Sequence, residues 1–101
     1  MEWKPFEEGN IKGVGRKCAD SIHELVVYKD KEKDNEYIMF MRETDKNPES
    51  YNISTSQKSP EDAYDHLYVG SPNEICEYWD DFFNSGHDED KASMLEALAK
   101  I

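Results

Sequence analysis

Two short runs of strand-forming residues constrain the fold of this 101-residue chain most strongly. The runs are Leu25–Tyr28 and Tyr37–Met41, and the stretch between them, KDKEKDNE, is entirely polar. Runs rich in Val, Ile, Tyr and Phe on either side of a polar loop predict an antiparallel β-hairpin. The alternating stretch Tyr51–Ser56 predicts a third strand. The fold therefore has to accommodate an antiparallel sheet.

In the N-terminal quarter of the chain, the apolar residues have the spacing of a helix instead. Five apolar residues in the stretch 11–25 recur at steps of three and four residues, which predicts a helix over part of Gly15–Glu24. Residues 1–10 contain the aromatic residues Trp3 and Phe6 but no periodic pattern. We expect these ten residues to form an extended arm whose aromatic side chains pack on the core.

The region after the hairpin carries two helix-start signals. Ser59 followed by Pro60 and two acidic residues predicts the beginning of a short helix. Residues 66–69 either complete this helix or form a fourth strand, and the pattern leaves both open. The sequence Ser71-Pro-Asn-Glu is a capping box, which predicts a helix over residues 72–84.

A last helix is predicted at the C-terminal end of the chain. Gly86 ends the preceding helix, and Asp88 can cap a helix that runs from Glu89 to Lys100. Its predicted buried stripe consists of Met94, Leu95, Leu98 and Ile101. Together these signals predict one α+β domain over residues 1–101, in which an N-terminal helix and two C-terminal helices pack on a three- or four-stranded antiparallel sheet.

The negative charge of the chain is concentrated in one segment. The formal net charge is −11, and Ser59–Asp90 contains ten acidic residues but no Lys or Arg. In helical projection, the aromatic residues of the stretch 72–84 fall on one arc and its acidic residues on the opposite arc. We expect the aromatic arc to pack in the core and the acidic arc to face water, because burial of unpaired carboxylates is prohibitive.

The acidic arc is the best candidate for a binding surface. Like charges at helical spacings destabilise a helix, and intervening lysines would normally remove that cost. Their absence indicates either a surface that binds a basic partner or a surface that serves solubility alone. The predicted partner-binding residues are Glu74, Glu77, Asp80, Asp81, Asp88, Glu89 and Asp90.

Charge and size suggest a non-enzymatic inhibitor. Phage anti-defence proteins and nuclease-immunity proteins are small and very acidic, and they mask the basic nucleic-acid-binding surface of an enzyme, in some cases by DNA mimicry. By this analogy we expect a protein partner with a basic surface and no direct binding of nucleic acid. The alternative is an adaptor or subunit that binds through exposed aromatic residues, either Trp3 and Phe6 or Tyr64 and Tyr68.

One local motif suggests a third function. The stretch IKGVGRKCADSI, residues 11–22, resembles the hairpin of helix-hairpin-helix DNA-binding proteins. The resemblance implies that backbone N–H groups of Gly13 and Gly15 hold a DNA phosphate, with help from Arg16 and Lys17. A net charge of −11 opposes such binding, because phosphate binding draws its affinity from Lys and Arg.

The sequence shows no motif for catalysis or metal binding. The three histidines are scattered, and no P-loop or zinc-ligand spacing occurs. We therefore expect neither an enzyme, nor a metal, nor a cofactor. No signal peptide and no membrane-spanning apolar segment is apparent, so we expect a cytoplasmic protein in which Cys18 and Cys76 are reduced thiols.

Overall fold

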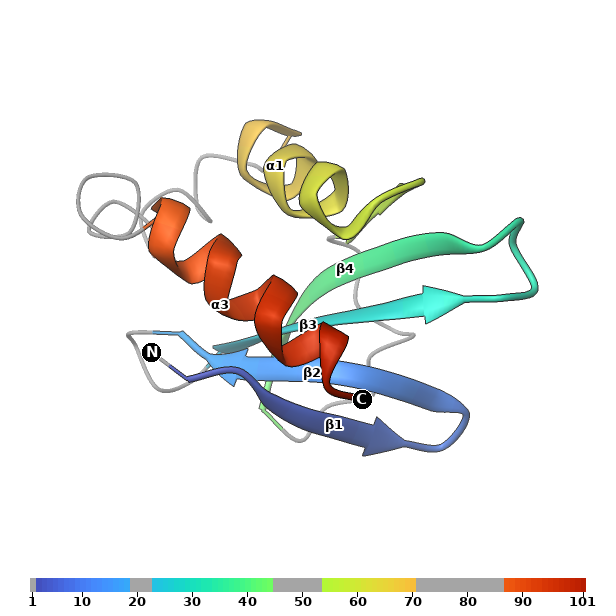
Figure 1. The fold of residues 1–101 in the computed structure, drawn as a ribbon, viewed down its shortest axis with the longest axis horizontal. Coiled ribbons are helices and arrows are strands. Elements are labelled where there is room, and N and C mark those ends of the chain that lie inside the picture. The colour runs from blue at the N-terminus through green and yellow to red at the C-terminus, as the bar shows by residue number, and fades with distance from the viewer. Residues whose placement is uncertain (1, 19–22, 45–53, 71–86) are drawn as a thin grey trace.

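The computed structural model describes residues 2–18, 23–44, 54–70 and 87–101. These residues form a five-stranded sheet in which each strand pairs antiparallel with the next one along the chain. Two helices accompany the sheet (Figure 1). The elements are β1 (Lys4–Glu8), β2 (Ile11–Lys17), β3 (His23–Asp30), β4 (Glu36–Glu43), β5 (Ser54–Gln57), α1 (Pro60–Gly70) and α3 (His87–Ala99).

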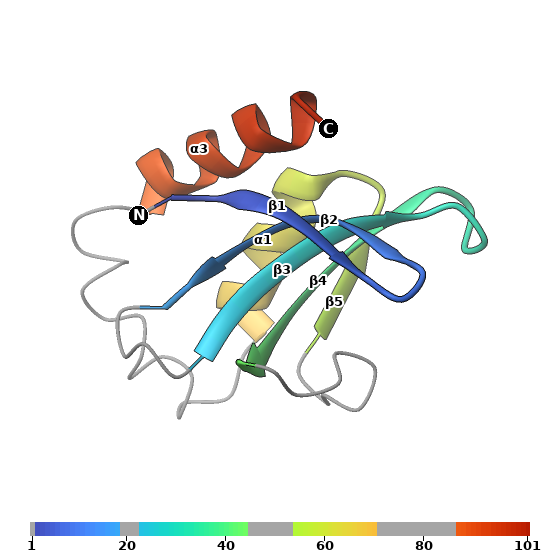
Figure 2. The same cartoon turned by 90° about the horizontal axis from the view of Figure 1, so that it is seen from below.

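Both helices pack on the same face of the sheet. Helix α1 contacts β4 and β5, whereas α3 contacts β1 and β2, and the two helices also contact each other. Figure 2 shows the strongly twisted sheet with α3 above its β1–β3 side. The helical layer and the sheet therefore enclose a single core between them.

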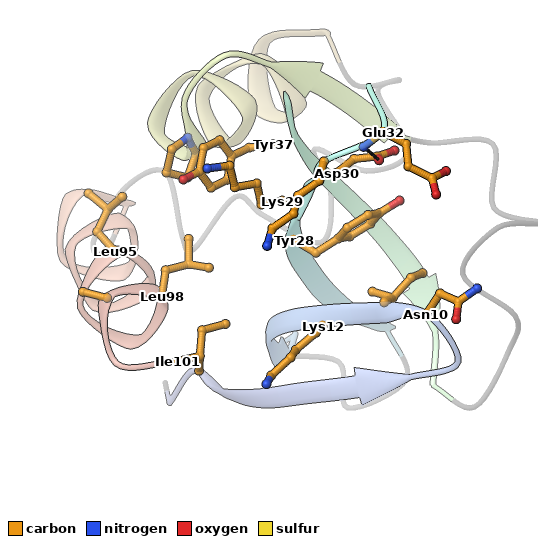
Figure 3. A pocket seen from close by; sticks show the side chains of 14 residues that line it. Asn10, Lys12, Tyr28, Lys29, Asp30, Glu32, Tyr37, Leu95, Leu98 and Ile101 are labelled. Carbon is orange, nitrogen blue, oxygen red and sulfur yellow. Dashed lines mark hydrogen bonds between the residues drawn. The ribbon is translucent and has the colours of Figure 1, made fainter. Parts of the chain in front are cut away.

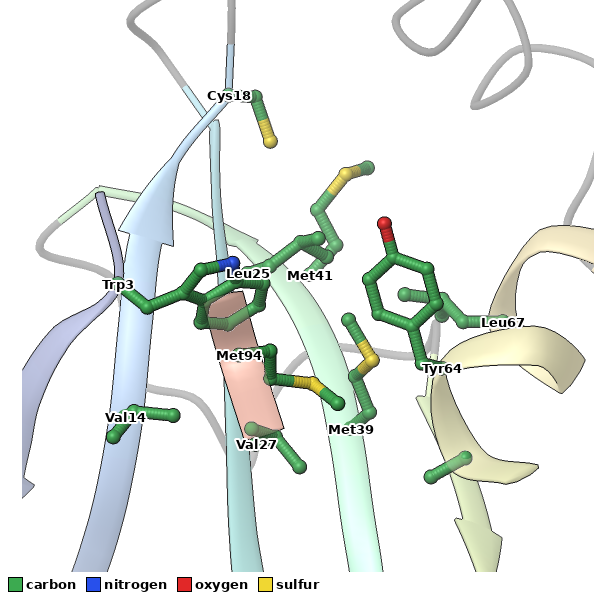
Figure 4. Packing of buried hydrophobic residues seen from close by; sticks show 11 residues of the cluster. Trp3, Val14, Cys18, Leu25, Val27, Met39, Met41, Tyr64, Leu67 and Met94 are labelled. Carbon is green, nitrogen blue, oxygen red and sulfur yellow. The ribbon is translucent and has the colours of Figure 1, made fainter. Parts of the chain in front are cut away.

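The main core lies between the sheet and the helices (Figure 4). Alternate residues of the central strands point into it, as the two-residue period of a strand requires. Leu25 and Val27 of β3 and Met39 of β4 are fully buried there, beside Tyr64 of α1 and Met94 of α3. Long-range contacts between elements that are distant in sequence thus hold the helices on the sheet.

The opposite face of the sheet carries a second apolar cluster. Val26, Ile38 and Phe40 are buried there, and the partly buried Phe6 and Tyr28 pack against them. The rings of Tyr28 and Phe40 meet edge to face, with centroids 6.1 Å apart. The central strands are therefore apolar on both faces, which explains why the run Leu25–Tyr28 shows no polar alternation.

The predicted hairpin and the α+β class are confirmed. β3 and β4 form an antiparallel pair over their whole length, and the loop ends in Asp34 and Asn35, which both have φ 58°. These residue types tolerate the left-handed conformation better than most. The sheet has five strands, however, rather than the three or four that the sequence predicts.

The predicted N-terminal helix over part of Gly15–Glu24 is wrong. Residues 11–17 form β2, and β3 begins at His23. A Cβ atom on Gly13 would lie 2.0 Å from the carbonyl oxygen of Val27, so this glycine permits a close approach of β2 and β3. The hairpin that the helix-hairpin-helix resemblance implies is not formed, since the residues that match its turn lie inside β2.

The N-terminal ten residues join the sheet. Lys4–Glu8 form the edge strand β1, paired with β2 in the register Pro5↔Val14. Phe6 packs against the second apolar cluster, and Trp3 is buried in the main core. Residues 4–8 of this segment are extended, and they are paired with a neighbouring strand.

The C-terminal helix predictions have mixed outcomes. Ser59 caps α1 by accepting a hydrogen bond from the Asp62 N–H at 3.1 Å, and residues 66–69 complete that helix. The predicted helix over 72–84 lies outside the described residues. In α3, Met94 is fully buried and Leu95 and Leu98 pack against the core. Ile101 is 49% exposed, so its assignment to the buried stripe is wrong.

Candidate functional site

Among the residues that the structure describes, the excess negative charge belongs to the helical layer. In the described part of the chain, the residues of the sheet and its connections (2–18, 23–44 and 54–59) include nine Asp or Glu and nine Lys or Arg. Residues 60–70 and 87–101, which contain the helices, include seven Asp or Glu and two Lys. A partner would therefore meet a nearly neutral sheet and a strongly acidic helical layer.

The seven predicted partner-binding residues fall into three groups. Glu74, Glu77, Asp80 and Asp81 lie outside the described residues. Asp88 and Glu89 are exposed in the first turn of α3. Asp90 is buried, with 6% of its surface exposed. The sequence pattern predicts that Asp90 belongs to an exposed acidic surface. That prediction is corrected, because the Asp90 carboxylate points into the protein.

The Asp90 carboxylate is the centre of a buried polar cluster. Trp3 Nε1 donates to Asp90 Oδ1 at 2.8 Å, and Arg16 Nε lies 2.8 Å from the same oxygen. Arg16 Nη2 donates to Asp90 Oδ2 at 3.1 Å, and the Tyr64 hydroxyl donates to it at 2.6 Å. Three hydrogen bonds, one to Oδ1 and two to Oδ2, compensate the loss of water around this carboxylate. Arg16 Nε adds its charge beside Oδ1 but does not make a hydrogen bond there.

This Asp90 cluster joins elements that are far apart in the sequence. Trp3 precedes β1, Arg16 lies on β2, Tyr64 on α1 and Asp90 in the first turn of α3. The Arg16 guanidinium also lies 5.3 Å from the centroid of the Trp3 ring and donates to the Lys17 carbonyl oxygen at 3.0 Å. The cluster is enclosed in the interior, so its role is to position α3 on the sheet rather than to bind a ligand.

The burial of Trp3 and Tyr64 also bears on the aromatic alternative. Both side chains are buried in the main core, and Phe6 is partly buried in the second cluster. The side chain of Tyr68 lies outside the described residues. Neither of the two predicted aromatic patches therefore forms an exposed surface from the residues that the structure describes.

Some of the acidic residues of the helices have a lysine beside them, and others do not. Lys91 Nζ lies 3.0 Å from Asp65 Oδ1 and ties α3 to α1, and Lys100 lies 3.5 Å from Glu96. Within the part of the chain that the structure covers, Glu61, Asp62 and Glu89 have no basic side chain within 4.0 Å. Negative charge at both helix N-termini is also favoured by the helix dipole.

The acids of the β3–β4 hairpin are locally neutralised. Asp30 lies 3.9 Å from Lys33, and Glu36 lies 3.5 Å from Lys58, which directly follows β5. The Ser56 hydroxyl donates a hydrogen bond to Glu36 and lowers the pKa of its carboxyl below the ordinary 4.5, although partial desolvation opposes this. The charge of Lys58 lowers the pKa further. These residues are therefore weaker candidates for a partner-binding surface.

The lowered pKa makes Glu36 a source of pH-dependent stability. Above pH 4.5, the wild type is expected to be more stable than Glu36→Gln, because the folded state binds this proton more weakly than the unfolded state. The difference should shrink as the pH falls through the lowered pKa. Urea unfolding at a series of pH values measures it. A Ser56→Ala background should remove most of the difference, and a difference that widens toward low pH would contradict the assignment.

The described residues also form a groove at the far end of α3. It has a volume of about 890 Å³ and lies between the last turns of α3 and the ends of β2, β3 and β4 (Figure 3). Leu95, Leu98 and Ile101 line it from the helix, and Lys12, Lys29 and Tyr37 line it from the sheet. A smaller hollow of about 490 Å³ lies beside β1 and includes Phe6 and Cys18. The sequence patterns did not indicate either cavity.

The histidines do not meet in the described residues. His23 is buried, and its carbonyl oxygen accepts a hydrogen bond from the Cys18 N–H at 2.8 Å. His66 is exposed on α1. Among the residues the structure covers, no three His, Cys, Asp or Glu side chains are grouped to hold a metal ion.

No helix of the described residues combines the length and the apolar character that crossing a bilayer requires.

Comparison with known proteins does not place the chain in a family. No family model matches it, and neither the curated proteins nor the solved structures contain a match. Its function therefore has to be inferred from its own charges and contacts.

Proposed function

We propose that this protein is a non-enzymatic inhibitor that masks the basic nucleic-acid-binding surface of a target enzyme. The separation of charge between the two layers carries this proposal. The helical layer has seven acidic residues against two lysines in its described part, whereas the sheet layer is balanced. A surface of one sign attracts a partner of the opposite sign and repels nucleic acid itself.

The first turn of α3 is the described part of this surface. Asp88 and Glu89 are exposed there, directly after the stretch that contains Glu74, Glu77, Asp80 and Asp81. This acidic surface is defined here by those six residues. Matching charges of this kind accelerate association and select partners.

The Asp90 cluster anchors the first turn of α3, which carries Asp88 and Glu89. Asp90 follows Asp88 and Glu89 directly, and its carboxylate is bonded to Trp3, Arg16 and Tyr64. The first turn of α3 is thereby attached to β2 and α1. Residues on an anchored element lose little conformational freedom on binding, which lowers the entropic cost of the complex.

Charge reversal in the first turn of α3 tests the proposal. The wild type and Asp88→Lys/Glu89→Lys are immobilised, exposed to a lysate of the host cell at low salt, and eluted with a salt gradient. The wild type is expected to retain a nucleic-acid enzyme that elutes at moderate salt, since screening weakens exposed charge pairs. The double variant should retain at least tenfold less of that enzyme, given contributions of roughly 0.2–1 kcal/mol per lost pair and added repulsion.

A matched variant tests whether capture of the enzyme depends on where the charges lie or only on the net charge of the protein. Glu32→Lys/Glu43→Lys makes the same change in net charge on exposed positions of the sheet layer, and it should capture the enzyme as well as the wild type does. Neutralisation of Glu77, Asp80 and Asp81 together should abolish capture without unfolding the protein. Undiminished capture by both acidic-surface variants would refute the proposal.

A further inference from the structure

The groove at the end of α3 has two chemically different walls. Its helix side is aliphatic, formed by the partly buried Leu95 and Leu98 and by Ile101, which is 49% exposed. Its sheet side presents the ammonium groups of Lys12 and Lys29 and the ring of Tyr37. Figure 3 shows both lysines extending from the sheet toward α3, with Leu98 and Ile101 projecting toward them.

The two lysines occupy positions that face the helices. Lys12 shares a face of β2 with Val14, and Lys29 shares a face of β3 with Val27, by the two-residue period of a strand. Both valines are fully buried in the main core. Each lysine is thus two residues from a core valine on the same strand face. At these positions α3 no longer covers the sheet closely, and the groove begins there.

Neither ammonium group is neutralised by a carboxylate in the described residues. Among the described residues, no Asp or Glu lies within 4.0 Å of Lys12 or Lys29, which is also true of Lys4, Lys17 and Lys31. Glu7 is the cross-strand neighbour of Lys12 but does not form an ion pair with it. Lys29 pairs across the strands with Tyr37, and its Nζ lies 5.8 Å from the centroid of that ring. Lys12 and Lys29 are distinguished by their position opposite the apolar wall of the groove, in a chain of net charge −11.

We propose that this groove binds a free aliphatic monocarboxylate. The carboxylate of the ligand lies between Lys12 and Lys29, and its hydrocarbon chain lies against Leu98, Ile101 and the Tyr37 ring. A volume of about 890 Å³ is adequate for such a ligand, since ligand pockets are typically about 300–1,000 Å³. Apolar burial supplies the affinity, and the two ammonium groups select the charge of the head group.

The charges at the loop end of the groove bear on the orientation of the ligand. Asp30, Lys31 and Glu32 line its loop end. The Asp30 carboxylate accepts a hydrogen bond from the Glu32 N–H at 2.9 Å and lies 3.9 Å from Lys33. The loop end already has opposite charges close together, so it attracts an anionic head group less than the space between Lys12 and Lys29 does. The groove shares no residue with the acidic surface, so this proposal stands independently of the proposed inhibition.

Decanoate, below its micellar concentration and at low salt, is the probe that tests this site. Calorimetric titration should show saturable binding, and ¹H–¹⁵N spectra should shift for groove residues such as Lys12, Lys29 and Leu98. Decanamide, which has the same chain without the charge, should bind about tenfold more weakly, as expected for the loss of two partly exposed ion pairs. Equal affinity for the acid and the amide would overturn the assignment of the lysines.

Three variants locate the binding. Lys12→Gln/Lys29→Gln should weaken decanoate binding about tenfold and leave decanamide binding unchanged. Ile101→Ser, at an exposed position, should weaken both ligands without unfolding the protein. Lys4→Gln/Lys17→Gln makes the same charge change at exposed positions that do not line the groove and should bind as the wild type does. Absence of saturable binding, or equal affinity of both double variants, would refute the proposal.

Discussion

Replacement of Asp90 by alanine is expected to lower the free energy of unfolding by about 3–5 kcal/mol, the usual cost of removing one partner of a buried ion pair. The variant leaves the buried Arg16 guanidinium without its carboxylate. It also removes the acceptor for Trp3 Nε1 and for the Tyr64 hydroxyl. A loss of this size is a large part of the total stability of a small domain, about 5–15 kcal/mol. Urea unfolding followed by tryptophan fluorescence measures it.

Two further variants distinguish charge burial from simple loss of packing. Tyr64→Phe keeps the ring and removes one donor to Asp90, so it should lower the unfolding free energy by only about 0.5–1.5 kcal/mol. Arg16→Met/Asp90→Leu replaces both charges by apolar groups and should recover the part of the loss that comes from the unpaired guanidinium, because no charge stays buried. Trp3 Nε1 and the Tyr64 hydroxyl still lack their acceptor in this variant. A double variant as unstable as Asp90→Ala would show that packing, rather than the unpaired charge, dominates.

Replacement of Gly13 by alanine is the second change with a large expected effect. The new Cβ would lie 2.0 Å from the Val27 carbonyl oxygen and 2.8 Å from the Tyr28 Cβ. The oxygen belongs to the backbone of the paired strand β3, so the contact can be relieved only by moving the strands apart. Overpacking of this kind costs about 1–3 kcal/mol, and more where backbone has to move. The midpoint of thermal unfolding should fall accordingly.

Gly15 in the same strand is the matched control for this prediction. A Cβ at Gly15 would lie 3.2 Å from the Leu25 carbonyl oxygen and 3.4 Å from a Val26 methyl group. Gly15→Ala should therefore destabilise the protein clearly less than Gly13→Ala does. Equal effects of the two substitutions would mean that β2 and β3 are not as close at Gly13 as the structure shows.

The three consecutive acids at the start of α3 show how one sequence pattern divides into two roles. Asp88 and Glu89 are exposed, whereas Asp90 is buried and bonded to Trp3, Arg16 and Tyr64. A helix turns by about 100° per residue, so adjacent residues point in different directions. Loss of binding in an Asp90 variant would accordingly report unfolding, whereas loss in the Asp88/Glu89 variant would report the surface itself.

Local sequence was sufficient for the features that depend on neighbouring residues. The β3–β4 hairpin followed from two strand-forming runs around a polar loop, and the start of α1 followed from its Ser59 cap. The concentration of acids after Ser59 was visible in the sequence as well. Turn formation, capping and net charge are short-range or additive properties, so the order of residues determines them directly.

Tertiary structure alone decided the features that depend on long-range pairing. The three- and four-residue spacing within residues 11–25 suggests a helix, but pairing with β1 and β3 holds residues 11–17 as a strand. The burial of Asp90 required Arg16, 74 residues away, and Trp3, 87 residues away. The groove likewise combines lysines of β2 and β3 with the last turns of α3. Such contacts depend on which elements pack together, and local propensity carries no information about that choice.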